Sequence, residues 1–173
     1  MSLANREPAV AGTFYPADSQ RIAETLDRWF AGGTPPQDCW RAALVPHAGW
    51  MYSGRIAAQV LARVRIPSTV VVFCPQHQVG GEYCAVAPWG RWLYPGGSVE
   101  VDVELSAQLA SEVPGFRVDG GPHRQEHAIE VQLPLLARLA PASRLVAVAV
   151  GGVDLEQIHL CGAALAEVVR DRL

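Results

Sequence analysis

Hydrophobic positions in this chain fall into short continuous runs and into longer stretches with helical spacing. The continuous runs predict three strands, at residues 42–45, 69–74 and 144–150. The helical spacing predicts five helices, at about 19–30, 53–65, 103–113, from 122 or 126 to 140, and 155–172. Strands that alternate with helices are typical of an α/β fold. We therefore expect one domain over residues 1–173, with a layered, mostly parallel central sheet flanked by helices.

Local signals refine these elements. Asp18 or Ser19 can cap the first helix, and Ser53 can cap the second. The run at 69–74 is almost continuously apolar, as in a strand covered on both faces. Pro134 lies inside the predicted fourth helix, so we expect a kink there. Between residues 80 and 97 the pattern changes to short β-like pieces rich in aromatic residues, which predicts a short β excursion near the site.

Composition narrows the class of protein. The 173 residues carry a net charge of −3, half of them are hydrophobic and 18% are charged, which is typical of an ordinary globular protein. The Arg residues are scattered, so we expect no nucleic-acid partner. The apolar runs are too short to span a bilayer, and the amino terminus has no apolar signal core. We therefore expect a cytoplasmic protein with no membrane contact.

Four cysteines are spread along the chain with no Cys-x-x-Cys pair. This spacing argues against a zinc ribbon and gives no support to a disulfide framework. Cys74 has two interpretations, because it lies three residues before His77 at the end of a predicted strand. It is either a thiolate near that imidazole or a buried strand residue, and we favour the buried residue.

Two histidines follow predicted strands directly. His47 comes after the run at 42–45, and His77 comes after the run at 69–74. Ligands in open α/β sheets bind beyond the carboxyl ends of the strands, so both imidazoles are expected at one crevice. Two imidazoles can bind Fe, Zn or Cu, and a carboxylate or thiolate would complete the set. The alternative is that each histidine is a hydrogen-bonded loop residue.

A third histidine, His127, opens the predicted helix that ends near residue 140. A helix dipole disfavours a protonated imidazole at this position, which suits a neutral base or ligand. Glu126 and Glu130 act in the opposite sense, and they also fit a purely structural capping role. His123 is four residues from His127, but the preceding Gly-Gly-Pro places it at or before the helix start, which makes a helical metal pair doubtful. We interpret His159, on the last helix, as a surface or hydrogen-bonded histidine.

Three motifs together carry a resemblance to a known family. They are residues 46–54 (PHAGWMYSG), 74–77 (CPQH) and 126–134 (EHAIEVQLP), preceded by residues 8–16 (PAVAGTFYP). In this order they resemble the MEMO family, whose fold is similar to that of the class III extradiol dioxygenases, which are non-haem iron enzymes. The resemblance implies that His47 and His77 are metal ligands and that His127 is a base or proton shuttle.

Further site residues are expected around these three. Glu130 is a second candidate catalytic residue, and the candidate substrate-binding residues are Trp50, Tyr52 and Glu126. The resemblance also implies a longer protein, in which the carboxy-terminal part supplies a third metal ligand, a Cys or a carboxylate. This sequence ends at Leu173, so we expect a short form, natural or a fragment, that lacks that segment. We therefore expect Glu126, Glu130 or a residue of another subunit to take the place of the third ligand.

The resemblance also has local departures. Cys74 stands where the family usually has Gly, and Ala128 stands where it usually has Ser. These two positions, like the missing third ligand, bear on activity more than on fold.

The leading functional hypothesis is a dioxygenase-like, metal-dependent oxidoreductase. Fe(II) at His47 and His77 would bind an oxygenated substrate and O₂ while His127 moves a proton, and the aromatic segment 89–94 would line the pocket. One alternative is a non-catalytic module that binds a small molecule or peptide, for which the resemblance implies a radical-SAM-associated protein as partner. Another is a zinc-dependent hydrolase, and copper is a further candidate metal. An open sheet edge after the strand 144–150 predicts a homo-oligomer.

Overall fold

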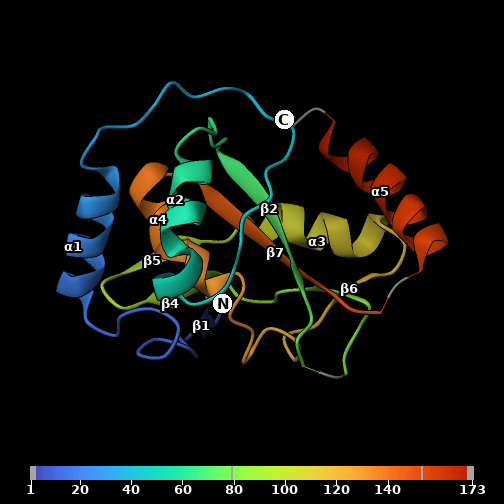
Figure 1. Cartoon of the computed structure of the whole chain (residues 1–173). Helices are drawn as coiled ribbons and strands as arrows, with labels where there is room; N and C mark the ends of the chain where they lie inside the picture. Colours follow the sequence, from blue (N-terminus) through green and yellow to red (C-terminus); the bar gives the residue numbers. More distant parts are fainter. Residues whose placement is uncertain (1–2, 79, 153, 171–173) are drawn as a thin grey trace.

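The computed structural model describes residues 3–78, 80–152 and 154–170. At its centre lies a four-stranded sheet (Figure 1). Its strands, in spatial order, are β2 (Thr69–Pro75), β7 (Arg144–Val150), β3 (Cys84–Val86) and β6 (Phe116–Val118). The pairs β2–β7 and β3–β6 are parallel, and β3–β7 is antiparallel. The expected α/β fold with a largely parallel sheet is confirmed.

A smaller sheet forms the β excursion. It contains β1 (Asn5–Arg6), β4 (Arg91–Tyr94) and β5 (Gly97–Glu100), in the order β1-β4-β5. β4 and β5 are antiparallel neighbours, and the amino-terminal strand β1 pairs with β4 in parallel. The excursion predicted from residues 80–97 therefore exists, although the pairing with residues 5–6 has no signal in the local pattern.

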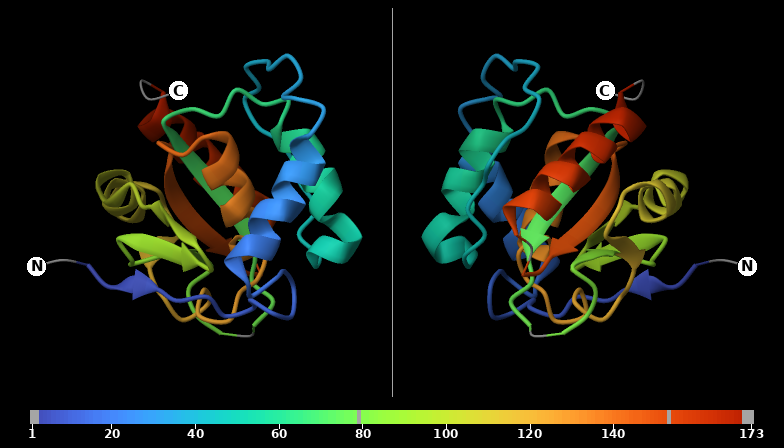
Figure 2. Two further views of the ribbon diagram at one scale, coloured as in Figure 1. Left: turned by 90° about the vertical axis from the view of Figure 1, so that its left-hand side faces the viewer. Right: turned by 90° about the vertical axis from the view of Figure 1, so that its right-hand side faces the viewer.

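Helices cover both faces of the central sheet (Figures 1 and 2). On one side lie α1 (Ser19–Phe30), α2 (Arg55–Leu61) and α4 (Leu133–Leu139), and on the other lie α3 (Val103–Glu112) and α5 (Leu155–Val169). Alternation along β7 explains the two layers, because successive side chains of a strand point to opposite faces. Leu145, Ala147 and Ala149 pack in the cluster that contains Leu133 of α4, whereas Val146 and Val148 pack against α3 and α5.

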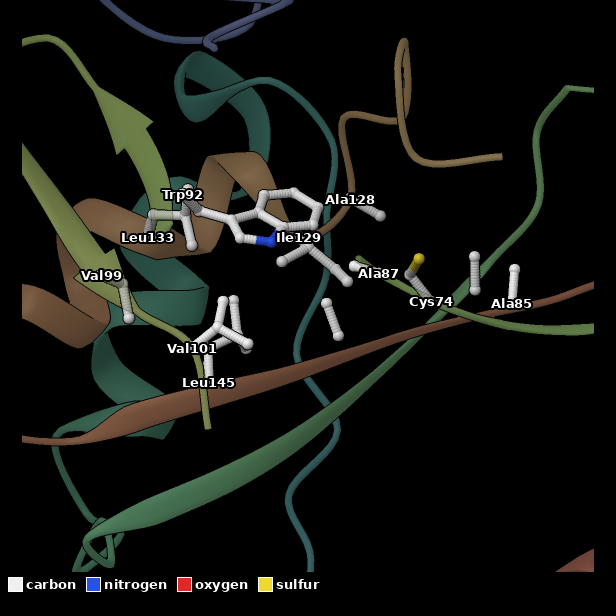
Figure 3. Close-up of a cluster of buried hydrophobic side chains, with 12 residues drawn as sticks. Cys74, Ala85, Ala87, Trp92, Val99, Val101, Ala128, Ile129, Leu133 and Leu145 are labelled. Atoms are coloured by element: carbon white, nitrogen blue, oxygen red, sulfur yellow. The ribbon is translucent and has the colours of Figure 1, made fainter. Parts of the chain in front are cut away.

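The core beside the site is built around Trp92 of β4, which has no exposed surface (Figure 3). Its ring lies among Leu133, Ile129 and Val99 in a cluster that also contains Cys74, the penultimate residue of β2. The segment before α4 and the end of β2 are therefore packed into the same core. This packing brings residues near 77 and near 127 together.

Most of the regular elements match their predicted positions. The strands at 69–74 and 144–150 and the helices near 19–30 and 103–113 are confirmed. Asp18 caps α1, since its side chain accepts a hydrogen bond from the Arg21 amide. The last helix begins at Leu155 with a capping box between Asp154 and Gln157 and ends at Val169; residues 171–173 of its predicted range lie outside the described residues.

The predicted strand at 42–45 is wrong. Within the described chain these residues belong to no ladder, and Leu44 is 93% exposed. A four-residue apolar run does not by itself distinguish a strand from an extended loop, and only a bonded neighbour makes it a strand. His47 therefore lies in an extended irregular segment, not at a strand end. β2 is an edge strand and is only half-buried. Val70 and Val72 pack against the core on one face and Val71 on the other, so the expected cover on both faces is present but partial.

Two helix predictions also need correction. The stretch predicted at 53–65 begins as a π-helical turn over Trp50–Gly54 and continues as α2. The Ser53 hydroxyl bonds back to the Ala48 carbonyl, and no side-chain cap is present. The helix predicted up to residue 140 is only α4, preceded by the 3-10 turn Glu130–Gln132. Pro134 lies in the first turn of α4, where proline costs no hydrogen bond, so it starts a helix and does not kink one.

The expected open edge on the strand 144–150 is absent. β7 has β2 on one side and β3 on the other, so the outer strands of the four-stranded sheet are β2 and β6. Self-association stays a prediction, but β7 cannot supply the edge for it. Among the described residues, no helix is both long and apolar enough to cross a membrane.

Candidate metal centre

Three histidines from distant parts of the chain converge on one point. His47, His77 and His127 each offer a ring nitrogen, and these nitrogens all lie within 4.8 Å of one another. The centroids of the His77 and His127 rings are 4.5 Å apart. The centroid of the His47 ring lies 5.4 Å from that of His77 and 5.7 Å from that of His127. The two histidines that were expected to meet do meet, and His127 joins them.

His77 lies two residues beyond β2, and a buried carboxylate fixes its ring. Its Nδ1 is 2.9 and 3.0 Å from the two carboxylate oxygens of Glu126, and its backbone amide donates to the same group. Glu126 has no exposed surface, whereas the His77 side chain is 40% exposed. An Nδ1–H that donates to a carboxylate leaves Nε2 with a free lone pair, which is the arrangement of a metal-ligating histidine.

The Glu126 carboxyl is ionised in this environment. Burial raises its pKa, but the Ala128 amide, the His77 amide and the His77 ring all bond to the charged form. These hydrogen bonds outweigh burial, and the pKa of Glu126 is lowered below its ordinary value. The charged carboxylate accepts the Nδ1 proton of His77 and so sets the tautomer of that ring.

His127 lies just before the turn at 128–129 that leads into the 3-10 turn Glu130–Gln132, and its ring is mostly buried. The ring of Phe14 stacks against it at a centroid distance of 4.3 Å. Burial lowers the pKa of His127, and the neighbouring His77 and His47 lower it further, while Glu126 acts in the opposite sense. The neutral imidazole is therefore favoured, and a metal ligand must be neutral.

The donor set fits a transition metal. Imidazole nitrogens suit zinc, copper, iron and nickel. Metal–nitrogen bonds of about 2.1 Å place two ligands of a tetrahedral ion about 3.4 Å apart. The upper limit of 4.8 Å found here is about 1.4 Å longer than this separation, and His77, which is 40% exposed, has the more accessible of the two rings that contact Glu126. Among the described residues this is the group of His, Cys, Asp and Glu side chains that is close enough to hold an ion.

Glu130, expected as a catalytic residue, has its carboxylate bonded to the amino-terminal segment. It pairs with the guanidinium of Arg6 and accepts hydrogen bonds from the amides of Ala9 and Val10 and from the Tyr15 hydroxyl. It has no exposed surface and is not part of the three-histidine group. Its contacts are those of a residue that fixes residues 6–15 against the core, and a catalytic role stays a prediction.

The three candidate substrate-binding residues differ in exposure. Trp50 is buried, donates its indole hydrogen to the Val131 carbonyl and packs on Trp29. Glu126 is fully buried behind His77. Tyr52, in contrast, is 75% exposed on the π-helical turn that follows the His47 segment. Of the three, only Tyr52 has a side chain that a ligand can reach directly.

The other residues considered from the sequence are either buried in the core or exposed on a helix. Cys74 is buried, and burial, followed by the Glu126 charge, raises the pKa of its thiol to about 12, which confirms it as a core residue. His123 is fully buried with Nε2 bonded to the Ala85 carbonyl at 2.8 Å, and it stands apart from the three-histidine group. Burial lowers the pKa of His123. His159 is exposed on α5, as expected. Trp92, expected in a pocket wall, lies in the core.

Two residues of the site environment were not among the candidate residues expected from the sequence. Phe14 stacks on His127, and Arg6 bonds the carbonyls of His123 and Glu126 while its guanidinium lies 4.6 Å from the centre of the Trp92 ring. Both belong to the amino-terminal segment, and their partners lie 86 to 120 positions further along the chain. The proline- and aromatic-rich pattern at residues 8–16 is the signal that could have pointed to Phe14.

Comparison with known proteins adds the family. The family model described as "Memo-like protein" matches residues 6–173. Relatives named MEMO1 family protein are 38% identical in Aquifex aeolicus, over 96% of this chain and 62% of the relative, and 35% identical in Thermococcus onnurineus, over 96% and 60%. A third, from Methanosarcina barkeri, is 38% identical over 95% of this chain and 61% of the relative. The chain spans about three fifths of the length of these curated relatives.

Proposed function

This chain belongs to the Memo-like protein family, and from that premise we propose that it binds one transition-metal ion through His47, His77 and His127. The observation that carries the proposal is the convergence of three ring nitrogens within 4.8 Å of one another. The contacts of Glu126 with the His77 ring support it, because histidine ligands need a partner that fixes their tautomer.

For the reaction, we propose dioxygenase-like oxidation of an oxygenated small molecule, with Fe(II) as the first candidate metal and copper as the second. Such an ion supplies Lewis-acid and redox chemistry when it is bound. Residues of this chain would orient the ligands of that ion. Glu126 fixes the His77 ring, and Phe14 covers one face of the His127 ring. Tyr52 and Met51, both largely exposed next to the His47 segment, are the side chains that a small-molecule or peptide ligand would meet first.

A zinc-dependent hydrolase is the second candidate, and the donor set favours it. Three histidines without a carboxylate are a ligand set of catalytic zinc, whereas non-haem iron oxygenases typically use two histidines and one carboxylate. Among the described residues, the group contains no carboxylate oxygen, since Glu126 bonds to a ligand and not to the metal position. Zinc loading together with ester hydrolysis would favour this candidate over the oxidoreductase.

Metal content is the deciding measurement. The chain, purified without chelator, is analysed by plasma mass spectrometry beside the double variant His47→Ala/His77→Ala and the control variant His159→Ala, which removes an exposed histidine of α5. We expect close to one equivalent of metal in the wild type and in the control and very little in the double variant. Equal, negligible metal in all three would contradict the proposal and favour a non-catalytic binding module.

The role of His127 is tested in the same assay. If His127 is the third ligand, His127→Ala loses metal in the way the double variant does. If it is a base or proton shuttle, as the sequence suggested, His127→Ala keeps its metal and loses only turnover. We expect metal loss, because the His127 nitrogen lies within 4.8 Å of the other two ring nitrogens. The lowered pKa of His127 also favours the neutral imidazole, which is the form that binds a metal.

A further inference from the structure

We propose that Gln132 is a positioning residue that places His47 for metal binding, an inference that rests on the proposed metal site. Gln132 is the last residue of the 3-10 turn before α4, and its side chain is 4% exposed. Its Nε2 donates a hydrogen bond of 2.9 Å to the carbonyl oxygen of Pro46, the residue that precedes His47.

This hydrogen bond acts on His47 through a rigid unit. The Pro46 carbonyl and the His47 nitrogen belong to one planar peptide group, so a fixed carbonyl fixes the plane from which the His47 Cα extends. Proline also restricts its own φ and the conformation of the residue before it. The backbone around Pro46 therefore has few ways to move once its carbonyl is held.

The segment that carries His47 has few other constraints. Among the described residues, the stretch 41–47 lies in no helix or strand, and the bond from Gln132 is its one hydrogen bond to the rest of the chain. Val45 packs against the neighbouring core, and downstream the Trp50 amide bonds the Phe14 carbonyl. Beyond His47, the Ala48 carbonyl accepts a hydrogen bond from the Ser53 hydroxyl. Without Gln132, residues 41–47 would therefore have no hydrogen bond to the rest of the described chain.

The side-chain oxygen of Gln132 shows that this contact has a cost in folding free energy. Oε1 of Gln132 is buried and has no hydrogen-bond partner. A buried acceptor without a partner is unfavourable for folding, and an apolar side chain of similar size would avoid that penalty. A glutamine at this position is thus explained by its donor, and the group that this donor meets is the Pro46 carbonyl.

One short segment then determines the geometry of all three ligands. Glu126 orients His77, His127 is itself a ligand, and Gln132 holds the peptide group of His47. Residues 126–132 thus supply, within one short stretch of sequence, the contacts that position all three ligand-bearing segments. The geometry of the proposed site consequently depends on the contacts of this segment.

The experiment compares Gln132→Leu and Gln132→Glu with the control Gln20→Leu, which makes the same change at an exposed position of α1. Zn²⁺ affinity is measured by competition with a chromophoric chelator, and thermal unfolding of the metal-free proteins shows whether each variant folds. In the metal-free proteins, the heteronuclear NOE of the backbone amides of residues 42–48 reports the order of the segment. Leucine removes both the donor and the unpartnered acceptor, and ionised glutamate keeps the shape but removes the donor.

We expect both Gln132 variants to fold, to bind Zn²⁺ at least about tenfold more weakly than the wild type, and to lose order at residues 42–48, with the control unchanged. Unchanged Zn²⁺ affinity in the Gln132 variants would overturn the inference while the metal site stands. If the wild type binds Zn²⁺ no better than His47→Ala/His77→Ala, the metal site itself fails. In that event the NOE values decide about Gln132, and unchanged order at residues 42–48 would overturn its positioning role as well.

Discussion

Glu126 and Glu130 are four residues apart, fully buried and bonded to different parts of the chain. Glu126 bonds His77 and Ala128, and Glu130 bonds four groups of residues 6–15. The sequence could not separate these roles, because both residues look like acids near a helix start. Apart from the Ala128 amide, two positions from Glu126, their partners are 49 to 124 positions away, and only tertiary packing selects them.

Removal of the Glu130 carboxylate should destabilise the fold. Glu130→Ala leaves the Arg6 guanidinium buried without its ionic partner and removes the acceptor for two amides and the Tyr15 hydroxyl. The loss of one partner of a buried ion pair costs about 3–5 kcal/mol, so we expect the free energy of unfolding in urea to fall by about that much. Glu104→Ala, at an exposed position of α3, is the control. A loss below about 1 kcal/mol, together with lost turnover, would instead support the catalytic role expected from the sequence.

Thiol reactivity should follow burial. Cys39 is exposed, whereas burial raises the thiol pKa to about 12 for Cys74 and, together with the neighbouring Cys161, to about 11 for Cys84. A raised pKa lowers the thiolate fraction, which at pH 8 is about one in a thousand for a pKa of 11, and the thiolate is the reactive form. With a disulfide reagent at pH 8, we expect Cys39 to react first and Cys74 and Cys84 to react only after denaturation. Rapid native labelling of Cys74, identified by peptide mapping, would contradict the packing of β2.

At the scale of helices and strands, the spacing of apolar residues predicted those elements whose formation depends on local interactions. α1 and α3 have apolar positions at helical intervals and aspartate caps, and β2 and β7 are long apolar runs, so their patterns are sufficient. The run at 42–45 was too short to decide, since a strand exists only with a bonded neighbour. Pro134 was misinterpreted because proline at a helix start and proline inside a helix look alike until the start is known.

The contact between α1 and the start of α2 depends on a glycine. A Cβ on Gly54 would lie 2.5 Å from the tip of the Trp29 ring and 3.0 Å from the Trp50 ring. Because overpacking typically costs about 1–3 kcal/mol, we expect Gly54→Ala to lower the free energy of unfolding by that amount. Gly162→Ala on α5 is the matched control, since its Cβ meets nothing within 4 Å and alanine favours the helix.

A double variant tests the cause of that loss. Trp29→Leu shortens the side chain that collides with the new methyl group, so Gly54→Ala should cost less in its presence than alone. Strict additivity of the two changes would mean that the contact between Trp29 and Gly54 is not the source of the loss.

At the scale of the whole molecule, the site was predicted in part. His77 could be found from the end of β2, whereas His47 was expected after a strand that does not form. The family resemblance implied both as metal ligands and His127 as a base or proton shuttle. The part played by Phe14, Arg6 and Gln132 could not be predicted, because each acts across at least 80 positions of the chain. A histidine can be recognised as a candidate ligand from the sequence, whereas the residue that orients it can be identified only from the folded structure.

Metal binding should therefore stabilise the whole fold. The three ligands lie 30 to 80 positions apart, so an unfolded chain does not present them together, and an ion that binds only the folded state stabilises it by RT ln(1 + [L]/Kd). At a Zn²⁺ concentration of about one hundred times Kd this amounts to about 2.7 kcal/mol. For a chain of this size we expect a rise in Tm of about 5–10 °C, reversed by chelator. His159→Ala should show the same rise and His47→Ala/His77→Ala none. An equal rise in the double variant would place the bound ion elsewhere on the protein.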